Sequence, residues 1–222
     1  MLTVAHVESP FKSKFGVPRQ AGIVDCHCRI VFEPLYRNAE ALRGLEEFDY
    51  LWLLFRFHLA ERQQWSPTVR PPRLGGNKRV GVFASRSPFR PNPIGLSSVR
   101  LVSIDDDPRL GPVLNVVGAD LVDGTPILDI KPYLTYADSH PEARSGFAPA
   151  QPEAVLRVLD PDGLLSPLPP GQRCPLTLAL AQDPRPHYHN DPERRYAMLF
   201  DRYDVHFRVD GDALVITALN VK

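Results

Sequence analysis

The sequence predicts a mainly β fold, either a sandwich or a barrel, followed by a small C-terminal unit. Two observations support the β fold: short runs of apolar and β-branched residues dominate the first two thirds of the chain, and clusters of Gly, Pro and Asp separate them. In addition, no GxGxxG sequence follows a strand, and strands do not alternate with helices. The chain therefore does not fit a doubly wound nucleotide-binding fold.

Six segments of the first part are expected to form strands because each is a short β-type run bounded by turn residues. They are residues 2–7, 23–32, 50–58, 80–84, 95–104 and 113–121. In the second of these, Cys26 and Cys28 share one strand face. Residues 50–58, YLWLLFRFH, are nearly all apolar, which predicts a central strand buried on both faces, with Trp52 and Phe55 in the core.

Helical and turn signals are fewer. Asn38 is expected to cap a single helical turn that ends at Gly44. Seven prolines between residues 149 and 175 indicate a boundary and a loosely structured connection. Beyond it, Asp210-Gly211-Asp212 lies between two strand-like runs and predicts a hairpin, because Gly accepts the positive φ of such a turn.

The composition is that of a globular chain of 222 residues, 43% hydrophobic and 23% charged. No window approaches the roughly 18 apolar residues of a membrane-spanning helix, and the N-terminus lacks the features of a secretory signal. The three cysteines, Cys26, Cys28 and Cys174, are too few and odd in number for a disulfide framework. We therefore expect a cytoplasmic protein without a membrane partner.

The net charge is zero, but residues 1–100 hold 15 Lys and Arg against 8 Asp and Glu, so the two halves carry +7 and −7. No acidic residue occurs from Gln63 to Ile104. The basic residues of this block are Arg70, Arg73, Lys78, Arg79, Arg86, Arg90 and Arg100. An ordered block of one sign favours a phosphate-bearing partner, and the alternative is a solvated loop.

The segment SRSPFRPNPIG at residues 85–95 is the strongest candidate ligand-binding loop. Its three prolines fix φ and remove backbone donors, so the segment is a stiff extended loop. Arg86, Arg90 and Asn92 lie between the prolines and offer donors at a low ordering cost. Gly95 then permits a close approach of the backbone.

A second candidate is DGTPILDIKPY at residues 123–133. After the Asp-Gly turn, Leu128 and Ile130 share one strand face, and Asp129 and Lys131 share the other. The alternative to a functional role is a surface ion pair, which contributes about 0–1 kcal/mol.

The phrases FASRSPFRPNPIGLS and DGTPILDIKPYLTYADS, with SPFKSKFGVPRQAG near the start, resemble the three signature segments of the TrmO family, S-adenosylmethionine-dependent tRNA adenine-N6 methyltransferases. YAMLFDRYDVHFRV resembles the tail domain of the family more loosely. The resemblance implies a β-barrel N-terminal domain at residues 1–145, a small α+β C-terminal domain at residues 146–222, and a homodimer with the cofactor near the subunit interface. The implied reaction methylates N6 of the threonylcarbamoylated adenosine 3′ of certain tRNA anticodons.

Motif positions also imply roles for individual residues. The implied cofactor contacts are Phe83, Arg86, Pro91, Asn92, Ile94, Gly95, Leu128, Asp129 and Lys131. Asp129 and Tyr133 are the candidate catalytic residues, although a carbamoylated N6 is acidic enough that a strong base is not required. The residues expected to meet tRNA phosphates are Lys12, Lys14, Arg19, Gln20, Lys78 and Arg79.

Other interpretations are weaker. Cys26-His27-Cys28 lacks a second cluster that would complete four metal ligands, so Cys26 and Cys28 are expected to be core residues. Residues 187–191, HYHND, lie beside prolines in an expected loop. No metal is therefore expected, and His58 is most simply a polar residue at a strand end. The competing function of a different class is a non-catalytic nucleotide- or RNA-binding β-barrel.

Overall fold

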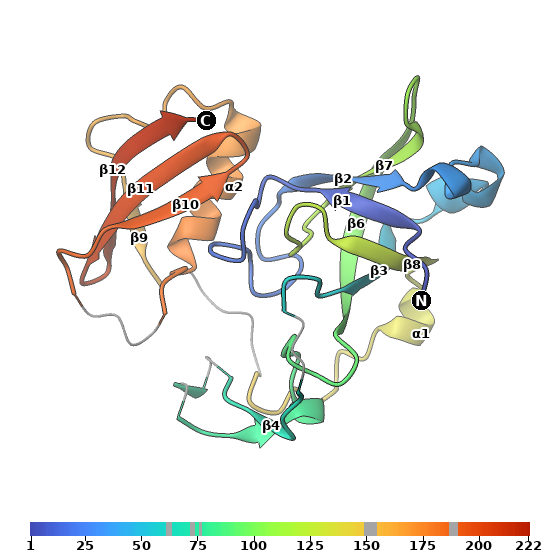
Figure 1. Ribbon diagram of the computed structural model, residues 1–222, viewed down its shortest axis with the longest axis horizontal. Coiled ribbons are helices and arrows are strands. Elements are labelled where there is room, and N and C mark those ends of the chain that lie inside the picture. Colours follow the sequence, from blue (N-terminus) through green and yellow to red (C-terminus); the bar gives the residue numbers. More distant parts are fainter. Residues whose placement is uncertain (61–63, 72–73, 76, 149–154, 187–190) are drawn as a thin grey trace.

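The computed structural model describes residues 1–60, 64–71, 74–75, 77–148, 155–186 and 191–222. It has two units, a larger sheet built from the first two thirds of the chain and a smaller sheet covered by one helix (Figure 1). The mainly β prediction is confirmed.

The first unit is one sheet that closes on itself. Its strands are β1 (Ala5–Glu8), β2 (His27–Phe32), β3 (Tyr50–Arg56), β6 (Ile94–Asp107), β7 (Gly111–Val117) and β8 (Pro126–Pro132). They pair in the order β1-β2-β7-β6-β3-β8, and β8 pairs in turn with β1. Every pairing is antiparallel. Closure leaves these strands without a free edge.

Only alternate side chains of β3 lie inside the closed sheet. Leu51, Leu53 and Phe55 are buried, whereas Trp52 is only partly buried and Tyr50 is 45% exposed. The expectation of a strand buried on both faces was therefore wrong, as was the assignment of Trp52 to the core, while that of Phe55 is confirmed. The reason is geometric: a closed sheet has one interior, so an apolar strand also places apolar side chains on its outer face.

Several predicted elements differ at their ends. Residues 80–84 form a short strand, β5 (Val80–Gly81), paired with β4 (Thr68–Val69), and then the 3-10 helix η5 (Val82–Ala84). Strand β7 ends at Val117 because Gly118, with φ of 88°, turns the chain. Between β2 and β3 lie the 3-10 helices η1 (Pro34–Tyr36), η2 (Ala39–Leu42) and η3 (Leu45–Glu47). The Asn38 cap is confirmed, because its side chain accepts a hydrogen bond from the Glu40 amide.

The C-terminal unit is a four-stranded sheet with one helix, preceded by the short helix α1 (Thr135–Asp138). Its elements are β9 (Arg157–Leu159), α2 (Pro170–Ala181), β10 (Tyr196–Phe200), β11 (Tyr203–Asp210) and β12 (Ala213–Val221). The strand order is β10-β11-β12-β9. The hairpin at Gly211 is confirmed, with φ of 57°.

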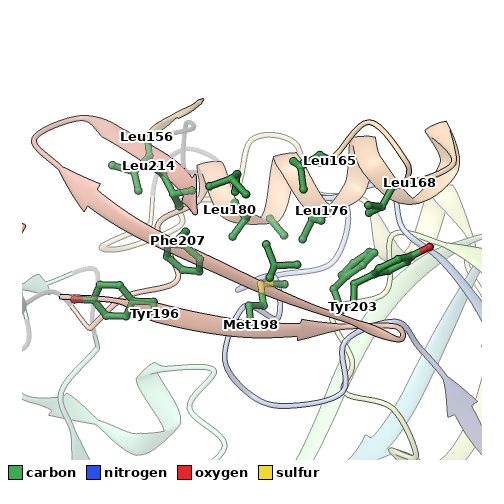
Figure 2. Packing of buried hydrophobic residues seen from close by; sticks show 14 of the residues in the cluster. Leu156, Leu165, Leu168, Leu176, Leu180, Tyr196, Met198, Tyr203, Phe207 and Leu214 are labelled. Atoms are coloured by element: carbon green, nitrogen blue, oxygen red, sulfur yellow. The ribbon is translucent and has the colours of Figure 1, made fainter. Parts of the chain in front are cut away.

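Helix α2 corrects the prediction of a loose connection up to residue 175. Proline is tolerated in the first helical turn, where its missing N–H has no intrahelical partner, so Pro170 is compatible with a helix start. Pro175 lies inside the helix and is buried. The following Leu176, Ala179 and Leu180 are buried against the sheet and stabilise the helix despite that proline (Figure 2).

The core of the C-terminal unit also contains residues from the start of the chain. Phe11, Val24 and Cys26 are buried in the same cluster as Met198 and Phe207. In Figure 1 the blue segment between β1 and β2 extends toward this unit. Among the described residues, no helix is long and apolar enough to cross a membrane.

Candidate functional site

Asp120 follows β7 and is the most distinctive polar residue of the first unit. The buried Ser97 of β6 donates a hydrogen bond from its hydroxyl to Asp120 Oδ1 at 2.5 Å. The backbone amide of Ala21 also bonds to the Asp120 carboxylate. Burial raises the pKa of Asp120, and these hydrogen bonds and the charge of Arg86 oppose that rise. The residue is a partly buried acid close to a cation.

Arg86 connects this acid to the loop at residues 12–22. Its Nη1 donates to Gln20 Oε1 at 2.7 Å, and its charge acts on Asp120. We refer to Gln20, Ala21, Arg86, Ser97 and Asp120 as the Asp120 cluster. Three chain segments and one strand therefore meet at it, which is an arrangement suited to binding a ligand with both positive and negative groups.

The loop at residues 85–93 is shaped by its own hydrogen bonds. The hydroxyl of Ser85 accepts from the Ser87 amide at 3.3 Å, and the hydroxyl of Ser87 accepts from the Phe89 amide at 3.3 Å. Arg90 Nη1 donates to the Ser85 carbonyl at 3.1 Å. Arg90 thus holds the loop, whereas Arg86 is exposed and directed to Gln20. Of the two arginines, Arg86 is the more exposed.

Gly95 has a packing role. A Cβ at this position would lie 2.2 Å from Cζ of Phe55, which is buried inside the sheet. The close approach that the sequence predicted is therefore made to Phe55. Of the other predicted cofactor contacts in this segment, Phe83 is 74% exposed, Pro91 and Asn92 are exposed, and Ile94 is partly buried.

Asp129 and Lys131 lie on the outer face of the closed sheet. Asp129 Oδ2 is 3.2 Å from Lys131 Nζ, and both side chains are at least half exposed. The register places Asp129 beside Leu54 and Lys131 beside Trp52. A register shift between Leu54 and Phe55 leaves Leu128 out of the Cα pairing. Among the described residues, no hydrogen bond or ion pair joins Asp129 to the loop at residues 85–93.

Tyr133 lies on the same outer face. Its ring centroid is 5.7 Å from that of Trp52 and 6.3 Å from that of Tyr50. Trp52 Nε1 donates to Asp138 Oδ2 at 2.9 Å. The hydrogen bond from the Leu134 amide, and after it the one from Trp52, lower the pKa of Asp138. The structure thus brings Asp129, Lys131 and Tyr133 together on one face, and among the described residues no hydrogen bond or ion pair links them to the Asp120 cluster.

The residues expected to bind tRNA fall into two groups. Four in the first loop make internal contacts: Lys12 Nζ lies 3.0 Å from Asp123 Oδ2, Lys14 Nζ donates to the Leu59 carbonyl at 2.8 Å, Arg19 Nη2 donates to the Asp183 carbonyl at 3.2 Å, and Gln20 accepts from Arg86. Lys78 and Arg79 are exposed, with Arg79 bonded to the Thr68 hydroxyl.

Other predicted features have mixed outcomes. Cys26 and Cys28 are buried, so the prediction that they are core residues is confirmed. Arg73 and residues 187–190 lie outside the described residues.

Sequence reasoning missed Asp120 and Ser97. Asp120 follows an apolar strand and stands between Ala119 and Leu121, both buried. The signal in the sequence was an acidic residue flanked by apolar residues at the end of an apolar run.

Comparisons with known proteins agree over nearly the whole chain. The model of the tRNA-methyltransferase O N-terminal domain matches residues 6–139, and that of the TrmO C-terminal domain matches residues 175–222. The tRNA (adenine(37)-N6)-methyltransferase of Escherichia coli K12 is 44% identical over 97% of this chain and 95% of its own length. A protein of Pseudomonas aeruginosa described as a putative S-adenosylmethionine-dependent methyltransferase is 41% identical over 96% of this chain and 93% of its own.

A solved structure supports the same relationship. The crystal structure of TrmO from Pseudomonas aeruginosa superposes with a TM-score of 0.76 at 32% identity, and covers 98% of this chain and 97% of that one.

Proposed function

The chain belongs to the TrmO family, and from that premise we propose that it is an S-adenosylmethionine-dependent tRNA methyltransferase acting on N6 of adenine 37. The observation that carries this function is the 44% identity to the Escherichia coli enzyme across 97% of the chain, with both family domains present. The finer substrate, a threonylcarbamoylated adenosine, is part of the proposal.

We assign the cofactor to the Asp120 cluster and the adjoining loop. S-adenosylmethionine carries an amino acid group with both charges and a ribose diol, and when bound it supplies an electrophilic methyl group on a sulfonium. Arg86 offers a guanidinium suited to a carboxylate. Asp120 offers a desolvated carboxylate suited to an ammonium or to ribose hydroxyls. The opposite charges of the two residues fit such a ligand.

The catalytic contribution of the protein is mainly positioning, because methyl transfer is an in-line displacement that needs alignment and the loss of one proton. Asp129 and Tyr133 remain the proposed proton acceptors. Asp129 lies in one row with Leu54 and Leu96 across three strands, and Leu96 directly follows the proposed cofactor loop. A substrate base lying over Leu96 would thus reach both regions.

We propose a homodimer formed through the outer face of β6, β3 and β8. This outer face exposes Tyr50 (45%), Leu96 (53%) and Val102 (46%), next to the partly buried Trp52 and Leu54. A twofold interface would cover these side chains on both copies. Asp129 and Tyr133 would then lie at the subunit interface.

The remaining parts take the following roles. The closed six-stranded sheet is the barrel of the catalytic domain, residues 1–145, and residues 146–222 form the C-terminal domain. Lys78 and Arg79 are exposed cations available for tRNA phosphates. Cys26, Cys28 and Cys174 are unpaired thiols, consistent with a reducing cytoplasm.

The decisive experiment is methyl transfer from labelled S-adenosylmethionine to bulk tRNA, followed by nucleoside analysis. We expect label in an N6-methylated adenosine at position 37. The competing function, a non-catalytic RNA-binding barrel, predicts tRNA binding without labelled product. Calorimetry with S-adenosylmethionine separates the two further, because a plain RNA binder gives no binding heat.

A further inference from the structure

The loop that enters the Asp120 cluster is packed into the core of the C-terminal unit. Phe11 forms a bridge with Phe200 of β10, and their rings meet edge to face at 5.4 Å. The ring of Phe15 stacks with Tyr196 at 6.3 Å and with Phe207 at 6.2 Å. Residues that precede β2 in the sequence thus belong to the hydrophobic core built by β10, β11 and α2.

Gly16 of the loop lies against Met198 of the C-terminal unit. It has φ of 90°, and a Cβ there would lie 2.3 Å from Sδ and 3.0 Å from Cγ of Met198. Met198 is fully buried between the sheet and α2 (Figure 2), so its side chain has little room to move. A buried side chain of the C-terminal unit therefore lies directly against the loop.

Polar contacts fix the same loop at both ends. The Asp201 amide donates to the Pro10 carbonyl at 2.6 Å, and Arg19 donates to the Asp183 carbonyl at 3.2 Å. Asp183 has φ of 50°, and its carboxylate accepts two hydrogen bonds from the Arg185 guanidinium, at 2.8 and 3.0 Å, and one from the Arg185 amide at 3.2 Å. The acceptor for Arg19 is thus held firmly by its own unit.

The next residues of the loop are members of the Asp120 cluster. Gln20 accepts from Arg86, Ala21 bonds to Asp120, and the Gly22 amide donates to the Gly118 carbonyl at 2.9 Å. We propose that the C-terminal unit is a positioning element for the cofactor site, acting through the contact of Met198 with Gly16 and through the Asp183 carbonyl. This inference rests on the proposed function for the identity of the ligand.

The test is a set of variants of the full chain: Gly16→Ala, Met198→Ala and the double variant. An alanine at φ of 90° is strained and also clashes with Met198. We expect Gly16→Ala to raise the Kd for S-adenosylmethionine about tenfold, with a larger change in KM than in kcat. In the background of Met198→Ala the same substitution should raise this Kd by a clearly smaller factor, because the clashing atoms of Met198 are absent.

Gly211→Ala is the matched control, because Gly211 has φ of 57° and a Cβ there meets nothing within 4 Å. It should lower the melting temperature without changing the Kd. The proposal is overturned if Gly16→Ala binds S-adenosylmethionine as tightly as the wild type. It is also overturned if Gly16→Ala raises the Kd by the same factor in the Met198→Ala background as in the wild-type background.

Hydrogen exchange of the Gly22 amide separates this inference from the proposed function. Gly16→Ala should speed this exchange, and the effect should be smaller in the Met198→Ala background, whether or not any ligand binds. A wild-type chain without affinity for S-adenosylmethionine would refute the proposed function, and the exchange data alone would then decide the positioning role. Unchanged Gly22 exchange in Gly16→Ala would overturn that role.

Discussion

Asp120 and Asp129 stand nine residues apart in the sequence, yet the structure gives them opposite surroundings. Asp120 is desolvated, accepts hydrogen bonds from Ser97 and Ala21, and lies near Arg86. Asp129 lies on the outer face of the sheet with a half-exposed side chain and pairs with Lys131 at 3.2 Å. Asp120 is thus a partly buried acid beside a cation, whereas Asp129 forms a solvent-screened ion pair.

The largest expected effect is that of Asp120→Asn on methyl transfer. Removing the charge takes away the desolvated anion while the shape is retained, so we expect turnover with tRNA to fall about 100-fold. The matched variant Asp129→Asn should lower kcat but leave the Kd for S-adenosylmethionine within about twofold, since exposed pairs contribute little. Equal losses of cofactor affinity in the two variants would refute the distinction between the two sites.

The stability of Asp120→Asn should change in the opposite direction to its activity. Because burial raises the pKa of Asp120 above 3.8, the folded state holds its proton more strongly than the unfolded state, and stability falls as pH rises from 3.8 through the folded pKa. Asp120→Asn should therefore melt at or above the wild-type temperature at pH 7, with the gain vanishing below pH 3.8. Calorimetric melts across this range provide the measurement.

Arg86→Ala tests the cationic residue of the Asp120 cluster. Loss of a charged hydrogen-bond donor costs about 1.5–3 kcal/mol, so the Kd for S-adenosylmethionine should rise roughly 10- to 100-fold. Arg79→Ala, at an exposed arginine bonded to Thr68, is the control and should leave this Kd unchanged. Isothermal calorimetry measures both, and wild-type affinity in Arg86→Ala would remove Arg86 from the cofactor site.

Leu96→Glu tests what covers the outer face. A charge on a twofold interface is repeated in both copies, so the dissociation constant of the dimer should rise at least about tenfold. Leu35→Glu introduces the same charge at a leucine that is 82% exposed in η1, outside this face, and should not alter assembly. Sedimentation velocity distinguishes the outcomes, and an unchanged dimer in Leu96→Glu would place the interface elsewhere.

The smallest expected effect is that of Lys78→Ala with Arg79→Ala on tRNA binding. For each cation that no longer meets a phosphate, the slope of log affinity against log salt should fall by about one, with no change in cofactor affinity. Arg43→Ala, at an exposed arginine paired with Glu40, is the control. An unchanged slope in the double variant would show that the tRNA binds to another surface.

Much of the fold was predictable because local patterns determine it. The strand at residues 95–104, the Asn38 cap and the hairpin at Gly211 follow from alternation, capping and turn chemistry. Helix α2 was missed because seven prolines between residues 149 and 175 indicate a loop, whereas Pro170 occupies the first turn and the apolar face of the helix packs on the sheet. Tertiary burial outweighed the local signal there.

The candidate site was predicted in part. The loop at residues 85–95 and Arg86 were identified from composition, since prolines stiffen a loop regardless of its surroundings. Gly95 was predicted to permit a close approach, and the ring of Phe55 lies against it, a contact between neighbouring strands that no local pattern reveals. Its contact with the cofactor stays a prediction. Asp120 was overlooked because its burial arises from a strand end, a serine of another strand and a distant loop.

By itself, the sequence determined the β architecture, the stiff basic loop and, through its motifs, the family. The tertiary structure decided which aspartate lies partly buried beside a cation, which arginine holds its own loop, and that Phe11, Phe15, Val17, Ile23 and Val24 pack into the core of the C-terminal unit. The physical reason is how far apart in the chain the interacting residues stand. Propensities, turns and alternation are set by neighbours in the chain, whereas desolvation and electrostatic interactions depend on groups that only the closed sheet and the packed units bring together.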